Sequence, residues 1–320
     1  MPRPNEPVVY ASPPLPRWNG EPLEGKAFAL WFEQGMGDAL QMLRYVPLLR
    51  QRGLRKLTVV GPPALRSLLA GVPGVDAVVV PGEQIGWHDH WCLMMSLPLH
   101  FGTTLETIPA ALPYLRPDAE RVARWAPKLP GACAWAWCGK ARICMPTTAT
   151  ARCPGWRRCG RSGMCQASRG SACRRARPKT RRPRRRRTSP LVPPGSEVED
   201  FADLAAVVAQ LDLVVCVDTA VAHLAGALGK PAWVLLPQFA SDWRWLHQRT
   251  DSPRYPGVLR LFRQQVAGDW SPVVRDVQQA LVRRVLASQP RNAQARMLLA
   301  SLSPPVSRAA MRRAVRPAGP

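Results

Sequence analysis

Short apolar runs alternate with amphipathic stretches in the N-terminal third of the chain. The run Ala27–Phe32 indicates a buried strand, and Ala39–Arg50 has apolar residues at helical spacing. We expect Pro47 to kink or shorten that helix. A second strand, a helix and a third strand follow at Leu57–Val60, Pro63–Ala70 and Asp76–Val80. This β-α-β-α-β order predicts a parallel sheet.

The same alternation returns after residue 200. The pattern predicts helices at Phe201–Leu211 and Thr219–Leu228, and buried strands at Leu213–Val217 and Ala232–Leu236. A further helical pattern lies around Pro272–Leu286. We therefore predict a second α/β half, which is typical of a two-domain protein of this length.

The composition along the chain suggests five regions. They are an extended Pro-rich lead-in at 1–22, an N-terminal Rossmann-like domain at 23–128, an aberrant segment at 129–192, a C-terminal Rossmann-like domain at 193–287 and a tail at 288–320. We expect the segment 129–192 and most of the tail to be disordered, apart from a short amphipathic stretch at Ala293–Leu302.

The net charge of +24 points at first to a nucleic-acid-binding protein. However, 15 Arg and 2 Lys, with no Asp or Glu, lie between Gly131 and Pro190. This segment supplies +17 and leaves only +7 for the rest of the chain. Seven of the nine cysteines also lie there, so that only Cys92 and Cys216 are elsewhere. Both the basic charge and the cysteine content therefore belong to one segment.

The segment from Gly131 to Pro190 has almost no apolar periodicity, so we expect neither a core strand nor an amphipathic helix in it. One interpretation is a basic disordered linker, and another is a nucleic-acid contact through Arg181–Arg187. A zinc site is the third, but the cysteine spacings are irregular and include no C-x-x-C pair.

The genetic code permits a fourth interpretation, in which residues from about 132 to about 190 are read in a displaced frame. Read from the third base of the first codon, Ala132–Gly139 becomes a strand-like run with three alternate positions restricted to Leu, Met or Val. In the same frame Ile143–Trp156 is compatible with the polar string H-A-N-D-R-H-R-S-L-P-G-L. We favour this interpretation, because it explains the charge, the cysteines and the lost periodicity together. It predicts that the C-terminal sheet of the chain as it stands lacks its first strands.

Two loops next to predicted strands contain candidate site residues. Gly35, Gly37 and Asp38 lie between a strand and a helix, where glycines let a ligand approach the backbone and the helix N-terminus favours anions. A tight turn with Asp38 as the N-cap is an equally good interpretation. Asp218 and Thr219 follow a buried strand, at the edge of a parallel sheet where ligands bind.

Other candidates have stronger structural alternatives. Thr219 is placed to cap the next helix and to contact a phosphate, and His223 lies on the same face of that helix. A core or capping role is the better interpretation of His223 from its spacing alone. Trp243, Arg244 and Trp245 are suited to clamping a sugar or nucleotide, with a packed surface loop as the alternative. For Ser96, His100 and Thr103, packing is favoured over contact with an acceptor.

Several motifs resemble those of heptosyltransferase-like glycosyltransferases of family 9, in the branch often linked to tetratricopeptide repeats. The matching motifs are E-Q-G-M-G-D at 33–38 with Gln41 and Arg44-Tyr45, L-M-M-S-L-P at 93–98, F-G-T at 101–103, D-T-A-V-A-H-L-A-G-A-L-G-K-P at 218–231, D-W-R-W at 242–245 and S-P-R-Y-P at 252–256. The resemblance covers about Trp18 to Leu286 outside the aberrant segment. The displaced reading also restores a strand and an N-D-R-x-R-S loop that the family has there.

The resemblance implies a GT-B fold, in which two Rossmann-like domains face a cleft and the second is incomplete. It implies an inverting, metal-independent glycosyltransferase that needs no cofactor. Asp38 would be the general base that deprotonates the acceptor hydroxyl. Asp218, Thr219, Ala220 and His223 would hold the donor diphosphate. Gly35, Gly37, Gln41, Trp243 and Arg244 would be further substrate contacts.

The expected partners follow from the same resemblance. The donor would be a nucleotide sugar like ADP-heptose, and the acceptor a glycan, a lipid-linked glycan or a protein. The N-terminus has no apolar core typical of a signal peptide, and no apolar run approaches the roughly 20 residues of a membrane span. We therefore expect a cytoplasmic protein, with peripheral contact at the inner membrane face compatible with the sequence. Nucleic acid is not an expected partner. The alternatives to an enzyme are a basic nucleic-acid-binding protein acting through the Arg-rich segment, and a non-catalytic scaffold. Because the family's basic donor-binding residues would lie in the aberrant segment, we expect the chain to be inactive or nearly so.

Overall fold

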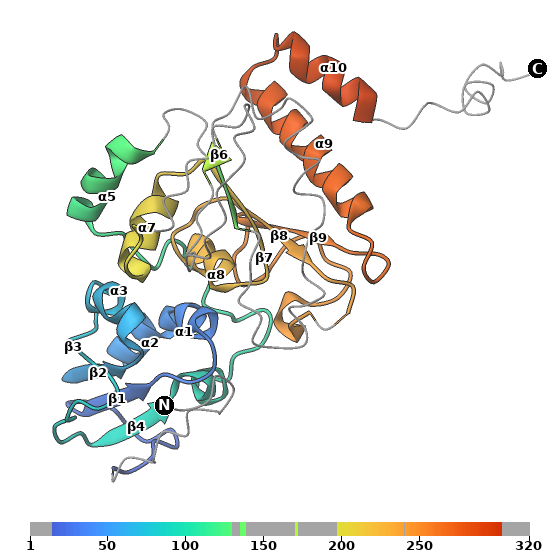
Figure 1. Ribbon diagram of the computed structural model, residues 1–320. Helices are drawn as coiled ribbons and strands as arrows, with labels where there is room; N and C mark the ends of the chain where they lie inside the picture. The colour runs from blue at the N-terminus through green and yellow to red at the C-terminus, as the bar shows by residue number, and fades with distance from the viewer. Residues whose placement is uncertain (1–14, 130–134, 139–169, 172–196, 240, 303–320) are drawn as a thin grey trace, which may run out of the picture.

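Two parallel β-sheets, each covered by helices, form an N-terminal and a C-terminal half (Figure 1). The computed structural model describes residues 15–129, 135–138, 170–171, 197–239 and 241–302. This arrangement confirms the predicted α/β fold class, while the predicted domain boundaries stay predictions.

The N-terminal sheet has the order β3-β2-β1-β4, and all neighbouring strands are parallel. Its strands are β1 (Ala27–Trp31), β2 (Lys56–Val60), β3 (Ala77–Val79) and β4 (His90–Leu93). The chain leaves β1 for β2 on one side and later returns to place β4 on the other side. This change of direction creates a crevice at the carboxyl end of β1, where ligands commonly bind in such sheets. The strand β4 was not predicted, because its four residues give too short a pattern.

The helices of this half are short. They are α1 (Met36–Met42), η1 (Leu43–Tyr45), α2 (Val46–Gln51), η2 (Pro63–Leu65), α3 (Arg66–Ala70), η3 (Met94–Ser96) and α4 (Leu97–His100). The expected interruption near Pro47 is confirmed, because the helical stretch divides and Pro47 lies in the first turn of α2. The missing N–H of proline costs no hydrogen bond at that position.

The C-terminal sheet has the order β6-β5-β7-β8-β9 and is also parallel. Its strands are β5 (Trp135–Cys138), β6 (Gly170–Ser171), β7 (Leu213–Val217), β8 (Ala232–Leu236) and β9 (Leu259–Arg263). The helices are α5 (Ala119–Trp125), η4 (Ala126–Lys128), α7 (Phe201–Ala209), α8 (Ala220–Ala227), η8 (Trp243–Trp245), α9 (Ser271–Ser288) and α10 (Ala293–Leu302). Here the direction changes between β5 and β7, next to the loop that begins at Asp218.

Strand β5 corrects a sequence prediction. We expected no core strand between Gly131 and Pro190 and a sheet without its first strands, but Trp135–Cys138 pairs with Leu213–Cys216 of β7. The run Ala-Trp-Ala-Trp-Cys is short, apolar and aromatic, which suits a strand even without strict alternation. Apart from β5 and β6, this segment lies outside the described residues, so its displaced frame and its expected disorder stay predictions. The same holds for 303–320 of the tail and for 1–14 of the lead-in.

The two faces of the C-terminal sheet have different cover. Helix α9 packs on the face formed by Leu213, Val215 and Val217 of β7, together with Trp233 and Phe262. The opposite face, formed by residues such as Val214 and Cys216, packs in the core that contains α8. That core continues into α1 of the N-terminal half, so the two halves share apolar packing. In the described residues, no helix is both long and apolar enough to cross a bilayer.

Candidate functional site

The candidate site lies where α1 meets α8. Each helix follows the strand at which its sheet changes direction, so both N-termini project from a crevice of their own sheet. A Cβ added to Gly37 would lie 2.7 Å from Cδ2 of His223 and 3.3 Å from Cα of Ala220. Glycine at position 37 therefore allows the first turn of α1 to approach the first turn of α8. Gly37 of the N-terminal half thus meets Ala220 and His223 of the C-terminal half, and all three were predicted site residues.

Asp38 is held by both halves of the protein. Gly35 is the N-cap of α1, and its backbone N–H donates to Oδ2 of Asp38 over 2.8 Å. The interpretation of Asp38 as the N-cap is therefore wrong, because the carboxylate reaches back from the third helical position. Its Oδ1 forms an ion pair with Nη2 of Arg244, and the two side chains are only 16% and 13% exposed.

Besides Asp38, Arg244 contacts Asp242 and Gln41. Its Nε donates to Oδ1 of Asp242 over 2.9 Å, and its Nη1 donates to Oε1 of Gln41 over 3.3 Å. Burial opposes the charged form, but the hydrogen bond to Asp242 and the charge of Asp38 hold the pKa of Arg244 above its ordinary value. Gln41 is buried, and its Nε2 has no hydrogen-bond partner in the described part of the chain. An unmet buried donor at this place is suited to a ligand oxygen.

His223 is a buried, neutral side chain of α8. Its Nδ1 lies 3.0 Å from the hydroxyl of Tyr255, and its ring stacks on Trp245 with 5.1 Å between the ring centroids. Burial, reinforced by the charge of Arg244, lowers the pKa of His223 to about 3. The described residues provide no partner for Nε2. Nδ1 of His223 is therefore part of the core, as the structural interpretation predicted. Nε2 lies near Gly37 and can still form a hydrogen bond with a ligand.

Asp218, Thr219 and Ala220 form the turn from β7 into α8. Burial raises the pKa of Asp218 to about 6, and the carboxylates of Asp242 and Asp38 add to this rise. Thr219 is the N-cap residue by position, but its hydroxyl donates to the carbonyl of Val217 over 3.3 Å. The predicted side-chain cap is therefore wrong, and no side-chain group caps the first N–H groups of α8. Such N–H groups are suited to an anion.

Two arginines of the site were not singled out from the sequence. Arg44 is buried, and its Nη1 donates to the carbonyl oxygens of Pro109 and Arg254 over 3.1 and 2.9 Å. Arg254 donates from Nη1 to the carbonyl of Arg244 over 2.7 Å. Burial and the nearby charges of Arg44 and Arg244 lower the pKa of Arg254 to about 10. Both arginines lie in motifs quoted above, but nothing in their spacing indicated that they meet Arg244.

The other predicted candidates differ in how far they are exposed to solvent. The side chain of Trp243 is 70% exposed, with the guanidinium of Arg254 5.5 Å from its ring centroid, whereas Trp245 is buried. Thr103 accepts a hydrogen bond from the hydroxyl of Tyr45 over 2.9 Å, and His100 packs against Trp18. Packing is thus the role that the structure gives to Thr103 and His100, as favoured from the sequence.

The segment that contains α7, β7 and α8 matches a known protein family. Residues 199–235 match the model of glycosyltransferase family 9 (heptosyltransferase). The resemblance to this family is confirmed. No curated protein matches the chain.

Solved structures of other proteins share the fold of this chain. The family 9 glycosyl transferase from Veillonella parvula DSM 2008 has a TM-score of 0.58 and 11% identity, and the match covers 86% of this chain and 92% of that one. ADP-heptose lps heptosyltransferase II from E. coli has a TM-score of 0.54 and 13% identity, with 82% and 99% covered. At these identities the matches establish the fold, which is the predicted GT-B fold.

The expectation of metal-independent chemistry needs correction. TibC from enterotoxigenic E. coli H10407 is described as an iron-containing dodecameric glycosyltransferase, with a TM-score of 0.54, 12% identity, and 79% of this chain and 66% of that one covered. Proteins of this fold are therefore not uniformly free of metal, and the expectation of no metal was wrong as a general rule. In the described residues of the present chain, no group of three His, Cys, Asp or Glu side chains is placed to hold a metal ion.

Proposed function

We propose that the protein transfers a sugar from a nucleotide-sugar donor, of the ADP-heptose kind, to an acceptor hydroxyl with inversion at the anomeric carbon. The observation that carries this proposal is the position of Asp38 opposite the N-terminus of α8, joined to the C-terminal half through Arg244. A base and an anion site thus face each other across the meeting point of two Rossmann-like halves. The acceptor is a glycan, a lipid-linked glycan or a protein.

The donor diphosphate is placed at the start of α8. The uncapped N–H groups after Thr219 supply hydrogen bonds, and the helix N-terminus adds a partial positive charge. Arg244 supplies the nearest full positive charge, with Arg254 next to it. Because His223 is neutral at physiological pH, its Nε2 contributes a hydrogen bond rather than charge. These groups stabilise the negative charge that grows on the leaving diphosphate.

Asp38 then acts on the acceptor. Its carboxylate takes the proton of the acceptor hydroxyl, and the hydroxyl oxygen forms a bond to the anomeric carbon from the face opposite the diphosphate. The bond between the anomeric carbon and the phosphate oxygen breaks, and its electron pair leaves with the diphosphate. In the structure Arg244 occupies Oδ1 of Asp38 and Gly35 occupies Oδ2. Each carboxylate oxygen has a second lone pair, so Asp38 can accept the proton while both contacts persist.

The experiment uses ADP as the binding probe and ADP-heptose as the donor. Asp38→Asn should retain ADP binding in calorimetry but lose ADP release by a factor on the order of 10²–10⁴. His223→Ala should weaken ADP binding itself. Glu106→Gln, an exposed carboxylate outside the site, is the matched control. Unchanged ADP release in Asp38→Asn would exclude Asp38 as the base.

The same assay tests the expected inactivity of this chain. That expectation rests on the segment 132–190, of which only β5 and β6 belong to the described residues. Robust ADP release by protein whose mass verifies this segment would contradict it. Nucleic-acid binding through residues 174–187 stays an alternative from the sequence, tested by a steep salt dependence of DNA binding that is lost when they are deleted.

A further inference from the structure

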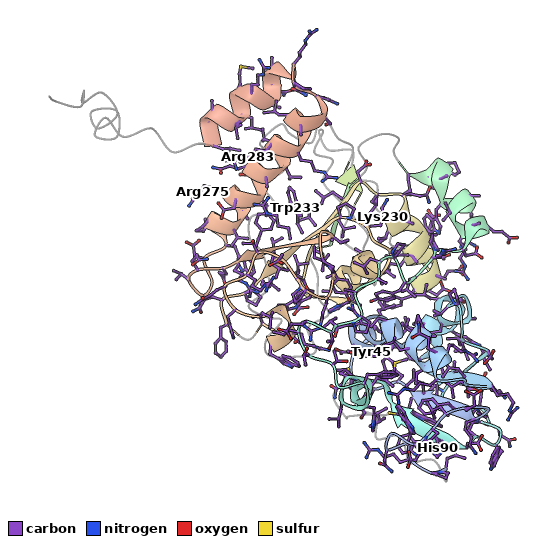
Figure 2. All side chains as sticks on the ribbon, turned by 180° about the vertical axis from the view of Figure 1, so that it is seen from behind. Tyr45, His90, Lys230, Trp233, Arg275 and Arg283 are labelled. Carbon is purple, nitrogen blue, oxygen red and sulfur yellow. The ribbon has the colours of Figure 1, made fainter. Side chains whose placement is uncertain are left out.

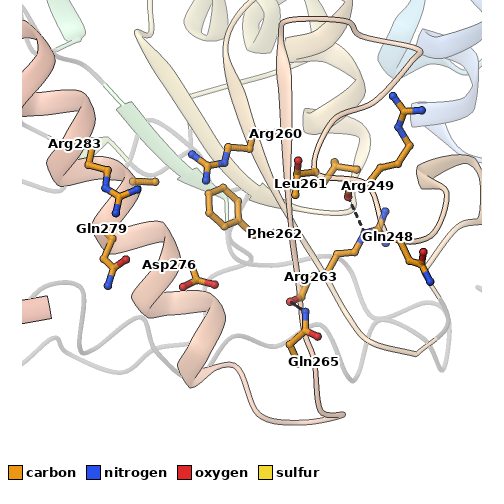
Figure 3. A pocket seen from close by; sticks show the side chains of 12 residues that line it. Gln248, Arg249, Arg260, Leu261, Phe262, Arg263, Gln265, Asp276, Gln279 and Arg283 are labelled. Carbon is orange, nitrogen blue, oxygen red and sulfur yellow. Dashed lines mark hydrogen bonds between the residues drawn. The ribbon is translucent and has the colours of Figure 1, made fainter. Parts of the chain in front are cut away.

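A cavity in the C-terminal half is lined by none of the residues proposed for the transfer reaction. It has a volume of ≈ 390 Å³ and lies between α9, the edge strand β9 and residues 248–250, which run beside β9 (Figure 3). The backbone N–H of Leu261 donates to the carbonyl of Thr250 over 2.8 Å, which fixes this wall. The volume lies within the range, roughly 300–1,000 Å³, that is typical of small-molecule sites.

The lining of the cavity is strongly basic. Four arginines and a single aspartate contribute to it: Arg249, Arg260, Arg263, Arg283 and Asp276. The charge of Arg249 is balanced by Asp251, to which Nε and Nη2 donate over 2.9 and 2.7 Å. The other three arginines have no carboxylate within ion-pair distance in the described residues. Among the described residues, the lining therefore carries more positive than negative charge, with Asp276 as its one carboxylate.

The two arginines nearest solvent come from different walls. Arg260 on β9 lies over the rings of Phe262 and Trp233, with its guanidinium carbon 4.7 and 5.9 Å from their centroids. This stacking fixes the plane of the guanidinium and leaves its N–H groups free for a ligand. Arg283 projects from α9, and Figures 2 and 3 show it on the same helix as Arg275 and Gln279. Guanidinium groups held in this way favour the bidentate binding of a phosphate.

The third arginine forms the inner wall of the cavity. Arg263 donates from Nε to the carbonyl of Arg249 over 3.2 Å, and from Nη2 to the carbonyl of Trp245 over 2.7 Å. These bonds go to neutral acceptors, so the charge of Arg263 persists. Burial lowers the pKa of Arg263, which is the cost of a charge held there without a carboxylate. An anion in the cavity would offset this cost.

The remaining polar groups indicate more than a bare phosphate. Gln248, Gln265, Gln279 and Thr250 also line the cavity. Nε2 of Gln279 donates to the carbonyl of Leu302 over 2.7 Å, and Nε2 of Gln265 donates to that of Arg263 over 3.4 Å. Their Oε1 atoms remain to accept hydrogen bonds from the hydroxyl groups of a sugar. We propose that this cavity is a binding site for a phosphorylated sugar, with the phosphate on Arg260 and Arg283 and the hydroxyls on the glutamines. This site does not depend on the proposed transfer reaction, because Asp38, His223 and Arg244 are not among its lining residues.

The test measures binding of glucose 6-phosphate to the full chain by calorimetry, with glucose and inorganic phosphate as separate probes. Glucose 6-phosphate should bind saturably with one site and more tightly than either probe alone. The double variant Arg260→Gln/Arg283→Gln should weaken this binding at least tenfold. Arg275→Gln, on the same helix but outside the cavity lining, is the matched control and should bind as the parent does.

The source of the phosphorylated sugar is distinguished with vesicles. Binding to phosphatidylinositol vesicles but not to phosphatidylcholine vesicles, lost in the double variant, would assign the ligand to a lipid headgroup. Binding of soluble glucose 6-phosphate alone would assign it to a free or glycan-bound phosphosugar. The proposal is overturned if neither probe binds saturably, or if the double variant, folded by circular dichroism, binds as tightly as the Arg275→Gln control. Loss of ADP binding at the Asp38 site would not affect either result.

Discussion

Arg244 of the C-terminal half forms an ion pair with Asp38 of the N-terminal half while its Nε and Nη2 donate to Asp242. The proposed base is thus neutralised by a cation that the proposed donor diphosphate would also attract. Nη1 donates one N–H to Gln41 over 3.3 Å and keeps a second N–H, with which the guanidinium can reach a diphosphate while it remains paired with Asp38 and Asp242. One guanidinium therefore links the proposed base to the proposed donor site.

Replacing Arg244 should affect both functions. Arg244→Gln removes the charge near the diphosphate, and we expect kcat/KM for the donor to fall by roughly 10²-fold. Arg244→Lys should restore little of this activity, because an ammonium lacks the planar fork that bridges two acceptors. Steady-state ADP release at varied donor concentration measures both variants.

The matched control for Arg244 is Arg66→Gln. Arg66 pairs with Glu83 over 2.5 Å, but the two side chains are 49% and 41% exposed, and neither residue belongs to the candidate site. Such exposed pairs contribute little, so activity and stability should remain close to those of the parent. Equal activity of Arg244→Gln and Arg66→Gln would show that Arg244 has no part in the reaction.

Gly37 should be required for the two halves to meet. In Gly37→Ala the new Cβ would lie 2.7 Å from Cδ2 of His223 and 3.3 Å from Cα of Ala220, and the second contact is with backbone. We expect α1 to shift away from α8, with a loss of about 1–3 kcal/mol in the free energy of unfolding and at least tenfold lower turnover. Denaturant unfolding and ADP release measure the two effects.

Gly86→Ala provides the comparison for Gly37→Ala. A Cβ at Gly86 meets nothing within 4 Å, and its φ is not in the left-handed region. This variant should unfold at the denaturant concentration of the parent and retain full turnover. If Gly37→Ala also behaves like the parent, the close approach of α1 and α8 is not a feature of the working protein.

The comparison of sequence and structure separates local pattern from packing. The runs that became β1, β7 and β8 were predictable because buried parallel strands are continuous apolar segments. Ligand binding by the loops after β1 and β7 stays a prediction. Strand β5 was missed because its neighbours in the chain have no periodicity, although pairing with β7 depends on backbone groups alone. A strand of four residues gives little pattern to recognise.

The site shows the same division. Asp38 and His223 were predictable from motifs, each within its own loop or helix. The contacts of Arg44, Arg244 and Arg254 depend on how the two halves pack, with Arg44 lying 210 positions from the residue whose carbonyl it contacts. No local pattern encodes such a separation. The sequence therefore indicated the chemistry of the site but not the cluster of arginines that completes it.

The pH dependence of stability should separate Asp218 from His223. The pKa of Asp218 is about 6 in the folded protein against an ordinary value of 3.8. Its ionisation is disfavoured by folding, so it reduces stability fully above pH 6, and this penalty disappears as the pH falls toward 4. Asp218→Asn should therefore raise the free energy of unfolding at pH 7, by about 3 kcal/mol, and have little effect near pH 4.

His223 should act in the opposite direction. Its pKa is about 3 in the folded protein against 6.5, so the unfolded chain binds a proton that the folded site resists. Stability from this group is complete above pH 6.5 and is lost as the pH falls toward 3. The two slopes oppose each other between pH 4 and 6, and partial cancellation is expected in the parent. On acidification from pH 6 to pH 4, Asp218→Asn should lose stability more steeply than the parent, because only the effect of His223 remains. Over the same range His223→Gln should gain stability, because only the effect of Asp218 remains. Urea unfolding at pH 7, 5.5 and 4 measures all three proteins, and identical slopes would mean that neither group is held as the structure has it.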